Sequence, residues 1–266
     1  AVNGFDNSDL SVANGTLSAV SSNDGGITWT ATFTPAMGVT DTSNVITLNN
    51  TGVSDAAGNT GTGTTNSNNY QVDTNVPTAT IVIADTTLSI GETSLVTVTF
   101  NSAVSGFDNA DLTVSNGTLS TLSSSDGGVT WTATFTPSAS ISDTSNVITL
   151  DNTGLVNGAG NAGVGTTDSN TYAVDTVRPT ATIVVADTAI AAGETSLVTI
   201  TFSEAVTAFT SADLTVANGL ISGLSSSDGG ITWTATFTPT NGVADTSNVI
   251  TLNNGGIVDL AGNANV

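Results

Sequence analysis

The stretch Thr28-Trp29-Thr30-Ala31-Thr32-Phe33-Thr34-Pro35 occurs again without change at 130–137 and at 232–239. Its apolar residues alternate with threonine, so that Trp29, Ala31 and Phe33 fall on one side of an extended chain and the threonines on the other. Alternation of this kind, in residues of high β propensity, is typical of a strand with one buried face. The stretch therefore predicts a sheet in each copy, with the tryptophans on the inward face.

The spacing of the copies is uniform along the chain. Trp131 follows Trp29 by 102 residues, Trp233 follows Trp131 by the same interval, and no insertion or deletion is needed to align them. A period of about 100 residues matches a whole domain rather than a solenoid unit. The alignment predicts three domains: residues 1–76, lacking the first two strands of a repeat, residues 77–178, a complete repeat, and residues 179–266, lacking the last strand. Because both outer copies are incomplete, we expect the chain to be an excerpt of a longer protein.

The middle copy contains seven predicted strands. Short runs of alternating or β-branched residues place them near 79–84, 94–100, 111–115, 118–123, 130–136, 146–150 and 171–174. Seven short strands in about 100 residues is the number found in an immunoglobulin-like sandwich. The predicted fold class is therefore all-β: tandem immunoglobulin-like seven-stranded β-sandwich domains, arranged end to end. A different seven-stranded Greek-key sandwich fits the same pattern.

Three local signals refine this prediction. Asn116-Gly117 lies between two predicted strands and is the sequence preferred by a type I′ hairpin turn, which needs positive φ at both central residues. Asp126 precedes two glycines, so we assign it to turn hydrogen bonding rather than to a metal site. The connection 175–179 between the middle and third copies is short and ends in Pro179. Proline makes it stiffer than a Gly/Ser tether, which predicts rod-like stacking.

The charge of the chain restricts its partners. It has 22 acidic residues and one basic residue, Arg178, with no histidine or cysteine, and its formal net charge is -21. Such a surface repels nucleic acid and anionic lipid, so we expect no nucleic-acid partner. The sequence contains no apolar run long enough for a transmembrane helix, so we expect no membrane insertion. Without histidine or cysteine there is no disulfide and no nitrogen or thiolate metal ligand. The abundance of Ser, Thr, Asn and Gly indicates a secreted protein.

The acidic residues fall almost entirely in predicted loops at the two ends of each sandwich. The loops at the end of one copy and those at the start of the next face each other across a linker. The candidate metal ligands are Asp73, Asp85, Glu92, Asp143, Asp175, Asp187, Glu194, Glu204, Asp213, Asp259 and Asn263. Two bare carboxylates about 4 Å apart repel by roughly 1 kcal/mol in water and by several-fold more at a protein surface, which favours a bridging cation.

Calcium is the cation that fits these ligands. It binds carboxylate, amide and carbonyl oxygens in irregular geometry, whereas zinc and copper prefer nitrogen or sulfur and magnesium retains its waters. Simple solvation of the carboxylates is the alternative explanation. The first junction, led by Asp73, has Ser102 where the second has Glu204, and Asn157 where the second has Asp259. We therefore expect the first junction to bind calcium more weakly.

Several blocks of the repeat resemble a known family. The blocks that a copy contains occur in the same order and at the same spacing. From the second junction onward they read Val174-Asp175-Thr176, Pro179-Thr180, Gly193-Glu194-Thr195, Phe202-Ser203-Glu204-Ala205-Val206, Asp213-Leu214-Thr215-Val216, Asp228-Gly229-Gly230 with Trp233, and Asp259 to Asn263. The blocks are similar to the bacterial Ig-like repeats of giant RTX-type adhesins and biofilm-associated surface proteins. This resemblance implies a secreted stalk on the bacterial cell surface that projects a ligand-binding region, with calcium between or within repeats to stiffen it.

The residues and the resemblance together favour a structural function, in which the partners of each repeat are its neighbours in the same chain. An enzyme is not expected, because only carboxylate pairs are left for acid/base chemistry and equivalent carboxylates occur in every copy. A self-assembling extracellular fibre or surface-layer protein with strand donation is one alternative. A carbohydrate- or protein-binding adhesion module is another, but it would display aromatic platforms, whereas the tryptophans are predicted to point inward.

Overall fold

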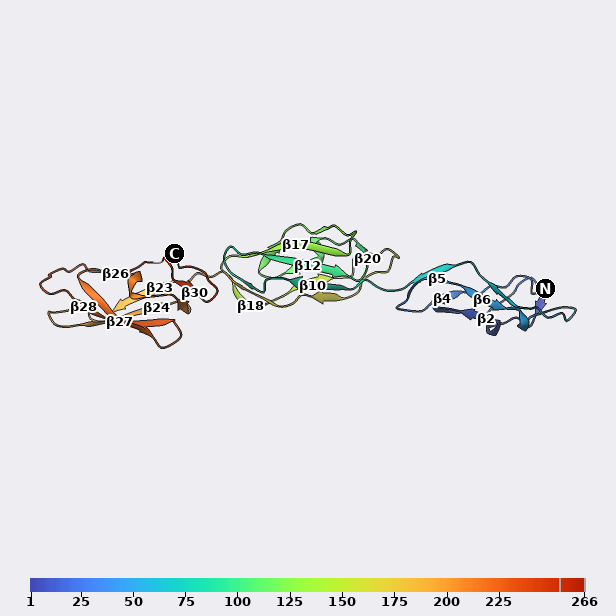
Figure 1. Ribbon diagram of the computed structural model, residues 1–266, viewed down its shortest axis with the longest axis horizontal. Coiled ribbons are helices and arrows are strands. Elements are labelled where there is room, and N and C mark those ends of the chain that lie inside the picture. The colour runs from blue at the N-terminus through green and yellow to red at the C-terminus, as the bar shows by residue number, and fades with distance from the viewer. Residues whose placement is uncertain (254, 266) are drawn as a thin grey trace.

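The computed structural model describes residues 1–253 and 255–265. They form three β-sandwiches that follow one another along the long axis of the molecule (Figure 1). Within the described residues the elements are strands and short 3-10 turns, without an α-helix. The prediction of an all-β fold made of tandem sandwiches is confirmed.

The first sheet of the middle repeat has four strands in the order β10, β12, β17, β15, all antiparallel. These strands span Ala79–Ile83, Ser94–Phe100, Thr130–Pro137 and Gly117–Leu119, and the short strand β16 (Ser123–Ser124) also pairs with β17. Apolar residues that alternate with threonine in β12 and β17 are buried, among them Val96, Val98 and Phe135. The alternating pattern in the sequence therefore identifies the buried side of this sheet.

The second sheet is built from two long, interrupted strands and their neighbours. Its order is β14, β19, β21, continued by β18, β22 and β11, where β11 runs parallel to β22. The bounds are Leu112–Val114, Ile148–Asp151, Thr166–Asp168, Ser142–Asn146, Tyr172–Asp175 and Thr87–Leu88. β18 and β19 follow each other closely along the chain, as do β21 and β22, so each pair acts as one long strand and the second sheet has three main strands with β14. Four strands facing three in this order is the immunoglobulin arrangement. It decides between the two sandwich topologies that the sequence pattern allowed.

The middle repeat has three further short elements, and the outer repeats contain the equivalents of most of its strands that lie within their residues. The three elements of the middle repeat are β13 (Val104–Ser105), η3 (Asn109–Asp111) and β20 (Val156–Asn157). The first repeat contains β1 (Val2–Asn3), η1 (Asn7–Asp9), β2 (Leu10–Val12), β3 (Gly15–Leu17), β4 (Phe33–Pro35), β5 (Thr40–Asn44), β6 (Ile46–Asn49), η2 (Asn50–Gly52), β7 (Ser54–Asp55), β8 (Thr64–Asn66) and β9 (Tyr70–Asp73). The third contains β23 (Ala181–Val185), β24 (Ser196–Phe202), β25 (Val206–Thr207), η4 (Ser211–Asp213), β26 (Leu214–Val216), β27 (Gly219–Ser226), β28 (Thr232–Pro239), β29 (Ile250–Leu252) and β30 (Val258–Asp259).

The core of the middle repeat lies between its two sheets. Val96, Val98 and Phe135 are fully buried there. Trp131 packs against this core and meets Phe107 edge to face, with ring centroids 5.3 Å apart. Trp131 Nε1 donates to the carbonyl oxygen of Gly128 at 3.2 Å. The inward orientation predicted for the tryptophan is confirmed, and burial of these rings and branched side chains holds the sheets together without a disulfide.

The predicted hairpin at Asn116-Gly117 is wrong. Asn116 has a φ of 54°, but Gly117 does not have positive φ, so a type I′ turn is not formed. The strands on either side belong to different sheets, because β14 pairs with β19 and β15 pairs with β17. Glycine is needed here for another reason: a Cβ on Gly117 would lie 2.3 Å from the ring of Phe135. The chain crosses from one sheet to the other over this ring.

The prediction that nearly all aspartates lie in loops is also wrong. Asp143 lies within β18, Asp168 ends β21 and Asp175 ends β22. The cause is the length of the strands predicted at 146–150 and 171–174. They begin earlier or extend further than their apolar residues indicate. The polar ends of these strands carry few residues that alternate clearly. Several carboxylates therefore project from ordered strand ends rather than from loops.

Candidate metal centre at the second junction

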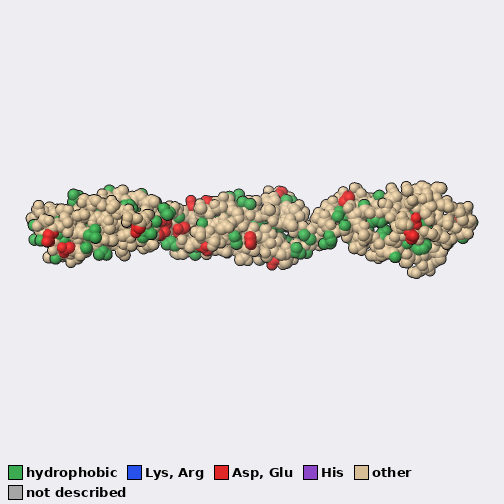
Figure 2. Space-filling model, turned by 90° about the horizontal axis from the view of Figure 1, so that it is seen from below, with side chains coloured by type: hydrophobic (Ala, Val, Ile, Leu, Met, Phe, Trp, Pro, Cys, Tyr) green, Lys and Arg blue, Asp and Glu red, His purple; other side chains and the backbone are tan. Residues whose placement is uncertain are grey.

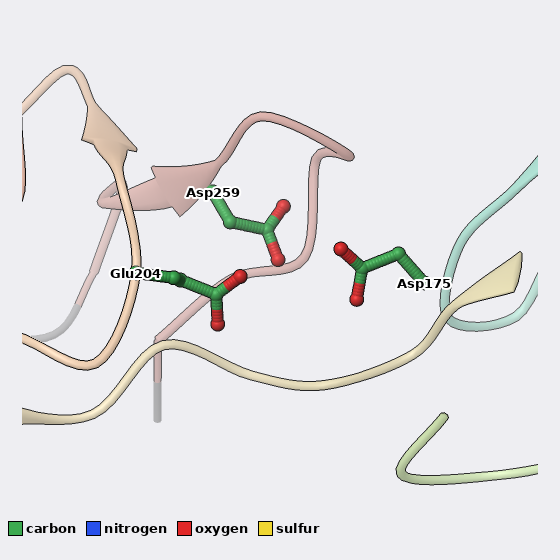
Figure 3. A group of neighbouring side chains, drawn as sticks. All are labelled: Asp175, Glu204 and Asp259. Atoms are coloured by element: carbon green, nitrogen blue, oxygen red, sulfur yellow. The ribbon is translucent and has the colours of Figure 1, made fainter. Parts of the chain in front are cut away.

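Three carboxylates converge at the second junction, between the middle and third repeats. Asp175 is the last residue of β22 and so stands at the end of the middle repeat. Glu204 follows β24 and Asp259 ends β30, so both belong to the third repeat. One carboxylate oxygen from each residue lies within 4.8 Å of the others. Figure 3 shows the three side chains pointing toward one another across the gap between the repeats.

Backbone pairing in the third repeat places two of these carboxylates side by side. Glu204 lies on the turn between β24 and β25, and β25 pairs with β30 through Val206 and Asp259. The loop that follows closes on its first residue, because the backbone nitrogen of Asn263 donates to Asp259 Oδ1 at 2.8 Å. The side-chain nitrogen of Asn263 donates to Asp259 Oδ2 at 2.9 Å. Asp259 is thus buried, and these two hydrogen bonds from Asn263 fix the orientation of its carboxylate.

Asn263 also joins the two repeats directly. Its Nδ2 donates to the carbonyl oxygen of Asp175 at 2.9 Å, and its Oδ1 accepts from the backbone nitrogen of Ile90 at 2.8 Å. Ile90 belongs to the loop after β11, at the far end of the middle repeat. Asn263 is almost fully buried, with 2 % of its surface exposed. A buried amide with its donor and acceptor both used sets the position of one repeat on the next.

The electrostatic field at this site is negative and uncompensated. Glu204 Oε1 is buried and finds no hydrogen-bond partner among the described residues. The pKa of Glu204 is raised, first by burial and then by the negative charges of Asp259 and Asp175. Arg178, the only basic residue, donates Nη1 to the carbonyl oxygen of Ala264 at 2.8 Å. A buried carboxylate oxygen without a partner is costly, and a cation would remove this cost.

The donor set fits a hard cation. It consists of carboxylate oxygens from two repeats, with the Asn263 amide and backbone carbonyl oxygens beside them. Calcium accepts such oxygens in flexible geometry, whereas the absence of histidine and cysteine from the sequence leaves zinc and copper without their preferred ligands. Figure 2 shows acidic side chains on both sides of this junction, while on the same face the other junction displays mainly apolar ones.

The other candidate ligands lie outside this cluster. Each accepts a hydrogen bond from a nearby backbone nitrogen at 2.8 to 3.1 Å. They are Asp73 (from Asn75), Asp85 (from Thr87), Glu92 (from Ser89), Asp143 (from Ser145), Asp187 (from Ala189), Glu194 (from Ala191) and Asp213 (from Thr210). Asp143 also accepts from Asn116 Nδ2 at 2.9 Å, and Asp213 completes the capping box of η4. These contacts stabilise turns and strand ends, and the structure does not bring these residues together with Asp175.

The first junction has the same loop but different chemistry. Asn157 occupies the position of Asp259, and its Oδ1 accepts from the backbone nitrogen of Asn161 at 2.9 Å, as Asp259 Oδ1 does in the third repeat. Its Nδ2, in place of the second carboxylate oxygen, donates to the carbonyl oxygen of Asn75 at 2.9 Å. Sequence reasoning recognised the loss of charge at this position. It missed the hydrogen bond, because only the structure shows which backbone oxygen faces the amide.

The aspartates beside the paired glycines are turn residues, as predicted. Both carboxylate oxygens of Asp126 accept from the backbone nitrogen of Thr130, at 2.9 and 3.0 Å. These hydrogen bonds lower the pKa of Asp126 to about 2. The equivalent Asp24 and Asp228 have the same contacts and the same lowered pKa, about 2. The carboxylates in these turns are saturated by the backbone.

One groove of the third repeat is explained by the fold. It has a volume of about 420 Å³ and lies between Ile183, Phe237 and Ile250. The equivalent residues of the middle repeat cover β22, where Phe135 packs on Tyr172 with ring centroids 5.0 Å apart. The groove thus corresponds to the position of a strand. Among the described residues, no helix has the length and apolar character needed to cross a membrane.

Comparison with known proteins gives one family match that covers the chain. The model of a family described as bacterial Ig-like domain matches residues 1–72, 73–174 and 175–266. No curated protein sequence matches the chain. Among solved structures, the Escherichia coli adhesin FdeC shares 12% identity over 95% of this chain and 84% of its own, with a TM-score of 0.33. The Yersinia pseudotuberculosis adhesin InvE shares 17% identity over 66% of this chain and 58% of its own, with a TM-score of 0.28.

Proposed function

Since the chain belongs to the bacterial Ig-like domain family, we propose that it is an extender segment of a bacterial cell-surface adhesin, stiffened by calcium at the second junction. Domains of this family are structural or adhesion modules, and the chain is not an enzyme. In this role the repeats hold a ligand-binding region away from the cell. The resemblance of the sequence blocks to those of giant RTX-type and biofilm-associated proteins supports the proposal of that subclass and of a secreted, surface-bound location.

The acidic cluster of the second junction carries the proposal. It combines three carboxylates from two repeats within 4.8 Å with a buried Glu204 oxygen that has no protein partner. Asp175 comes from one repeat and Glu204 and Asp259 from the next, so a bound cation would link the two sandwiches. A calcium ion binds several oxygen ligands at once, so it would replace the repulsion among the three carboxylates by attraction of each to the cation. A linker with such a cross-link resists bending.

The end-to-end arrangement supports an extender rather than a binding module. The three sandwiches are strung along one axis (Figure 1), so each added repeat lengthens the molecule. The tryptophans are half-buried on the inward face, where Trp29, Trp131 and Trp233 each meet a phenylalanine ring edge to face. They offer no aromatic platform of the kind that recognises carbohydrate.

The proposal is tested by calorimetry and small-angle X-ray scattering of the 266-residue chain, with calcium and with a chelator. We expect calcium to bind with measurable heat, the chain to stay monomeric, and its largest dimension to increase when calcium is added. The variant Glu204→Gln with Asp259→Asn should lose both effects. Binding heat that survives in this variant, or a largest dimension that is insensitive to calcium, would refute the proposed stiffening. Calcium-dependent self-association would instead support a fibre.

A further inference from the structure

The two junctions differ in how the same loop position meets the preceding repeat. At the second junction Asp259 has a carboxylate, whose oxygens can only accept; one of them lies in the cluster, and Oδ2 accepts from Asn263 Nδ2. At the first junction Asn157 presents a donor, the nitrogen Nδ2, and this donor reaches the carbonyl oxygen of Asn75. The other atom of each side chain is used identically inside the loop. One exchanged atom therefore separates a cation-binding arrangement from one that bonds to the backbone directly.

A second amide acts beside Asn157. Asn161 Nδ2 donates to the carbonyl oxygen of Asp73 at 3.1 Å, which corresponds to the bond from Asn263 to Asp175 at the second junction. The first junction thus has two amide hydrogen bonds from the middle repeat onto the end of the first repeat. The second junction has one such bond, and its cluster of carboxylates occupies the place of the other.

We propose that the first junction is a cation-independent joint, held by the side-chain amides of Asn157 and Asn161, so that calcium controls only the second junction. This inference rests on the calcium function proposed for the second junction. Asp73 is the only carboxylate of the three equivalent positions at the first junction, since Ser102 and Asn157 replace the other two. Its Oδ1 already accepts from Thr40 Oγ1 and from the backbone nitrogen of Asn75.

Amide geometry gives the physical reason. The hydrogens on Asn157 Nδ2 carry partial positive charge and point at the region that the cation needs, so a cation there would be repelled. The same hydrogens satisfy a backbone carbonyl that would otherwise need water. Asn157 has 6 % of its surface exposed, and hydrogen bonds sheltered from solvent hold geometry better than exposed ones. The first joint is therefore set at all calcium concentrations, while the second becomes stiff when calcium is bound.

The experiment measures the geometry of each junction separately. Because the chain has no cysteine, spin labels can be attached to introduced cysteines at Thr16, Thr118 and Leu220, which are exposed and equivalent in the three repeats. The pair Thr16→Cys and Thr118→Cys spans the first junction, and Thr118→Cys with Leu220→Cys spans the second. Electron dipolar spectroscopy gives the distance distribution of each pair, with calcium chloride and with a chelator.

We expect the first pair to have a narrow distance distribution in both conditions and the second pair to lose its narrow distribution in chelator. Adding Asn157→Asp should broaden the first pair in chelator, because the donor is lost while the loop, which contains aspartate in the other two repeats, still folds. Adding Ser102→Glu to Asn157→Asp should make calcium restore the narrow distribution. The first pair broadening in the parent chain upon chelation, or staying narrow with Asn157→Asp, would overturn the inference.

The failure of the proposed function has a different signature. If the second pair does not respond to calcium, the stiffening proposed for that junction is wrong, and the effect of Asn157→Asp on the first pair in chelator still decides whether the amides hold the first joint. The reciprocal variant, Glu204→Ser with Asp259→Asn, copies the first junction into the second. It should make the second pair insensitive to calcium, and a persistent response would contradict the inference.

Discussion

The two junctions of this chain use one loop in two chemical forms. In the first, Asn157 and Asn161 donate amide hydrogens to backbone carbonyls of the preceding repeat. In the second, Asn263 retains one such bond, and Asp259 joins Asp175 and Glu204 in a cluster of carboxylates. The two loops share their internal hydrogen bonds, from the backbone nitrogen of Asn161 to Asn157 Oδ1 and from that of Asn263 to Asp259 Oδ1, so the difference lies in the side-chain groups. If the second junction binds calcium as proposed, a change of side chain alone alters the response of a joint to cations within one fold.

The largest test of this comparison is Asp259→Asn. We expect calcium affinity at the second junction to fall by about 100-fold or more, because affinity of oxygen sites depends steeply on the number of charged ligands. Isothermal titration calorimetry measures it. Asp55→Asn is the matched control, since Asp55 begins the same loop in the first repeat and makes the same contacts with Asn59. Equal losses in both variants would mean that calcium binds these loops individually and that the junction is not the site.

The second test removes the amide that both junctions share. Asn263→Ala leaves the backbone nitrogen of Ile90 and the carbonyl oxygen of Asp175 without partners, so we expect a loss of about 2 kcal/mol in the free energy of unfolding. Urea unfolding followed by tryptophan fluorescence measures it. Asn59→Ala serves as control, because Asn59 is exposed and bonds only within its own loop. A loss for Asn263→Ala no larger than for Asn59→Ala would show that the amide does not join the repeats.

The third test uses pH. The raised pKa of Glu204 means that the calcium-free junction holds this proton more tightly than the unfolded chain, so without calcium the ionised group destabilises the fold and protonation relieves it. Calcium must displace the proton. Calcium affinity should therefore fall by up to about tenfold per pH unit as the pH drops through that pKa, and Glu204→Gln should remove this dependence. Calorimetry at several pH values measures it.

The acid limit of that experiment comes from the turn aspartates, whose linkage has the opposite sign. Asp24, Asp126 and Asp228 have folded-state pKa values of about 2, below the ordinary value of 3.8. Their contribution to stability is complete above the ordinary pKa and is lost as the pH falls through the lowered one. Measurements kept above about pH 4 therefore leave these turn aspartates ionised, and the difference between the parent chain and Glu204→Gln then reports on Glu204. A dependence that persists in Glu204→Gln within this window would assign the proton to another group.

The sequence predicts the repeat and its strands well, because both depend on local periodicity. The alternation of Trp131, Ala133 and Phe135 with threonine identifies β17, and the uniform interval between copies transfers this assignment along the chain. The meeting of Asp175 with Glu204 and Asp259 also follows from sequence, since strand order places all three at facing ends. These inferences need only direction and order, not atomic positions.

The remaining features depend on three-dimensional packing. Asn116-Gly117 has the composition of a hairpin, but the ring of Phe135 requires the glycine and the chain changes sheets there. The sequence predicts Asp143 as a metal ligand, and in the structure its carboxylate, on strand β18, accepts a hydrogen bond from Asn116. The donor role of Asn157 depends on the position of one backbone oxygen in another repeat. Sequence spacing alone does not encode such contacts.

The smallest expected effect concerns Arg178, which has Val76 as its counterpart at the first junction. The guanidinium is exposed and donates to the carbonyl oxygen of Ala264, so salt screens its repulsion of a nearby cation. Arg178→Val should raise calcium affinity by only about twofold, and less at high ionic strength. Titration at two salt concentrations measures the change, with Val76→Arg as the control that should leave it unaffected. A rise of more than about tenfold would mean that Arg178 partly neutralises the carboxylates, and the second junction would then differ from the first in degree of compensation rather than in kind.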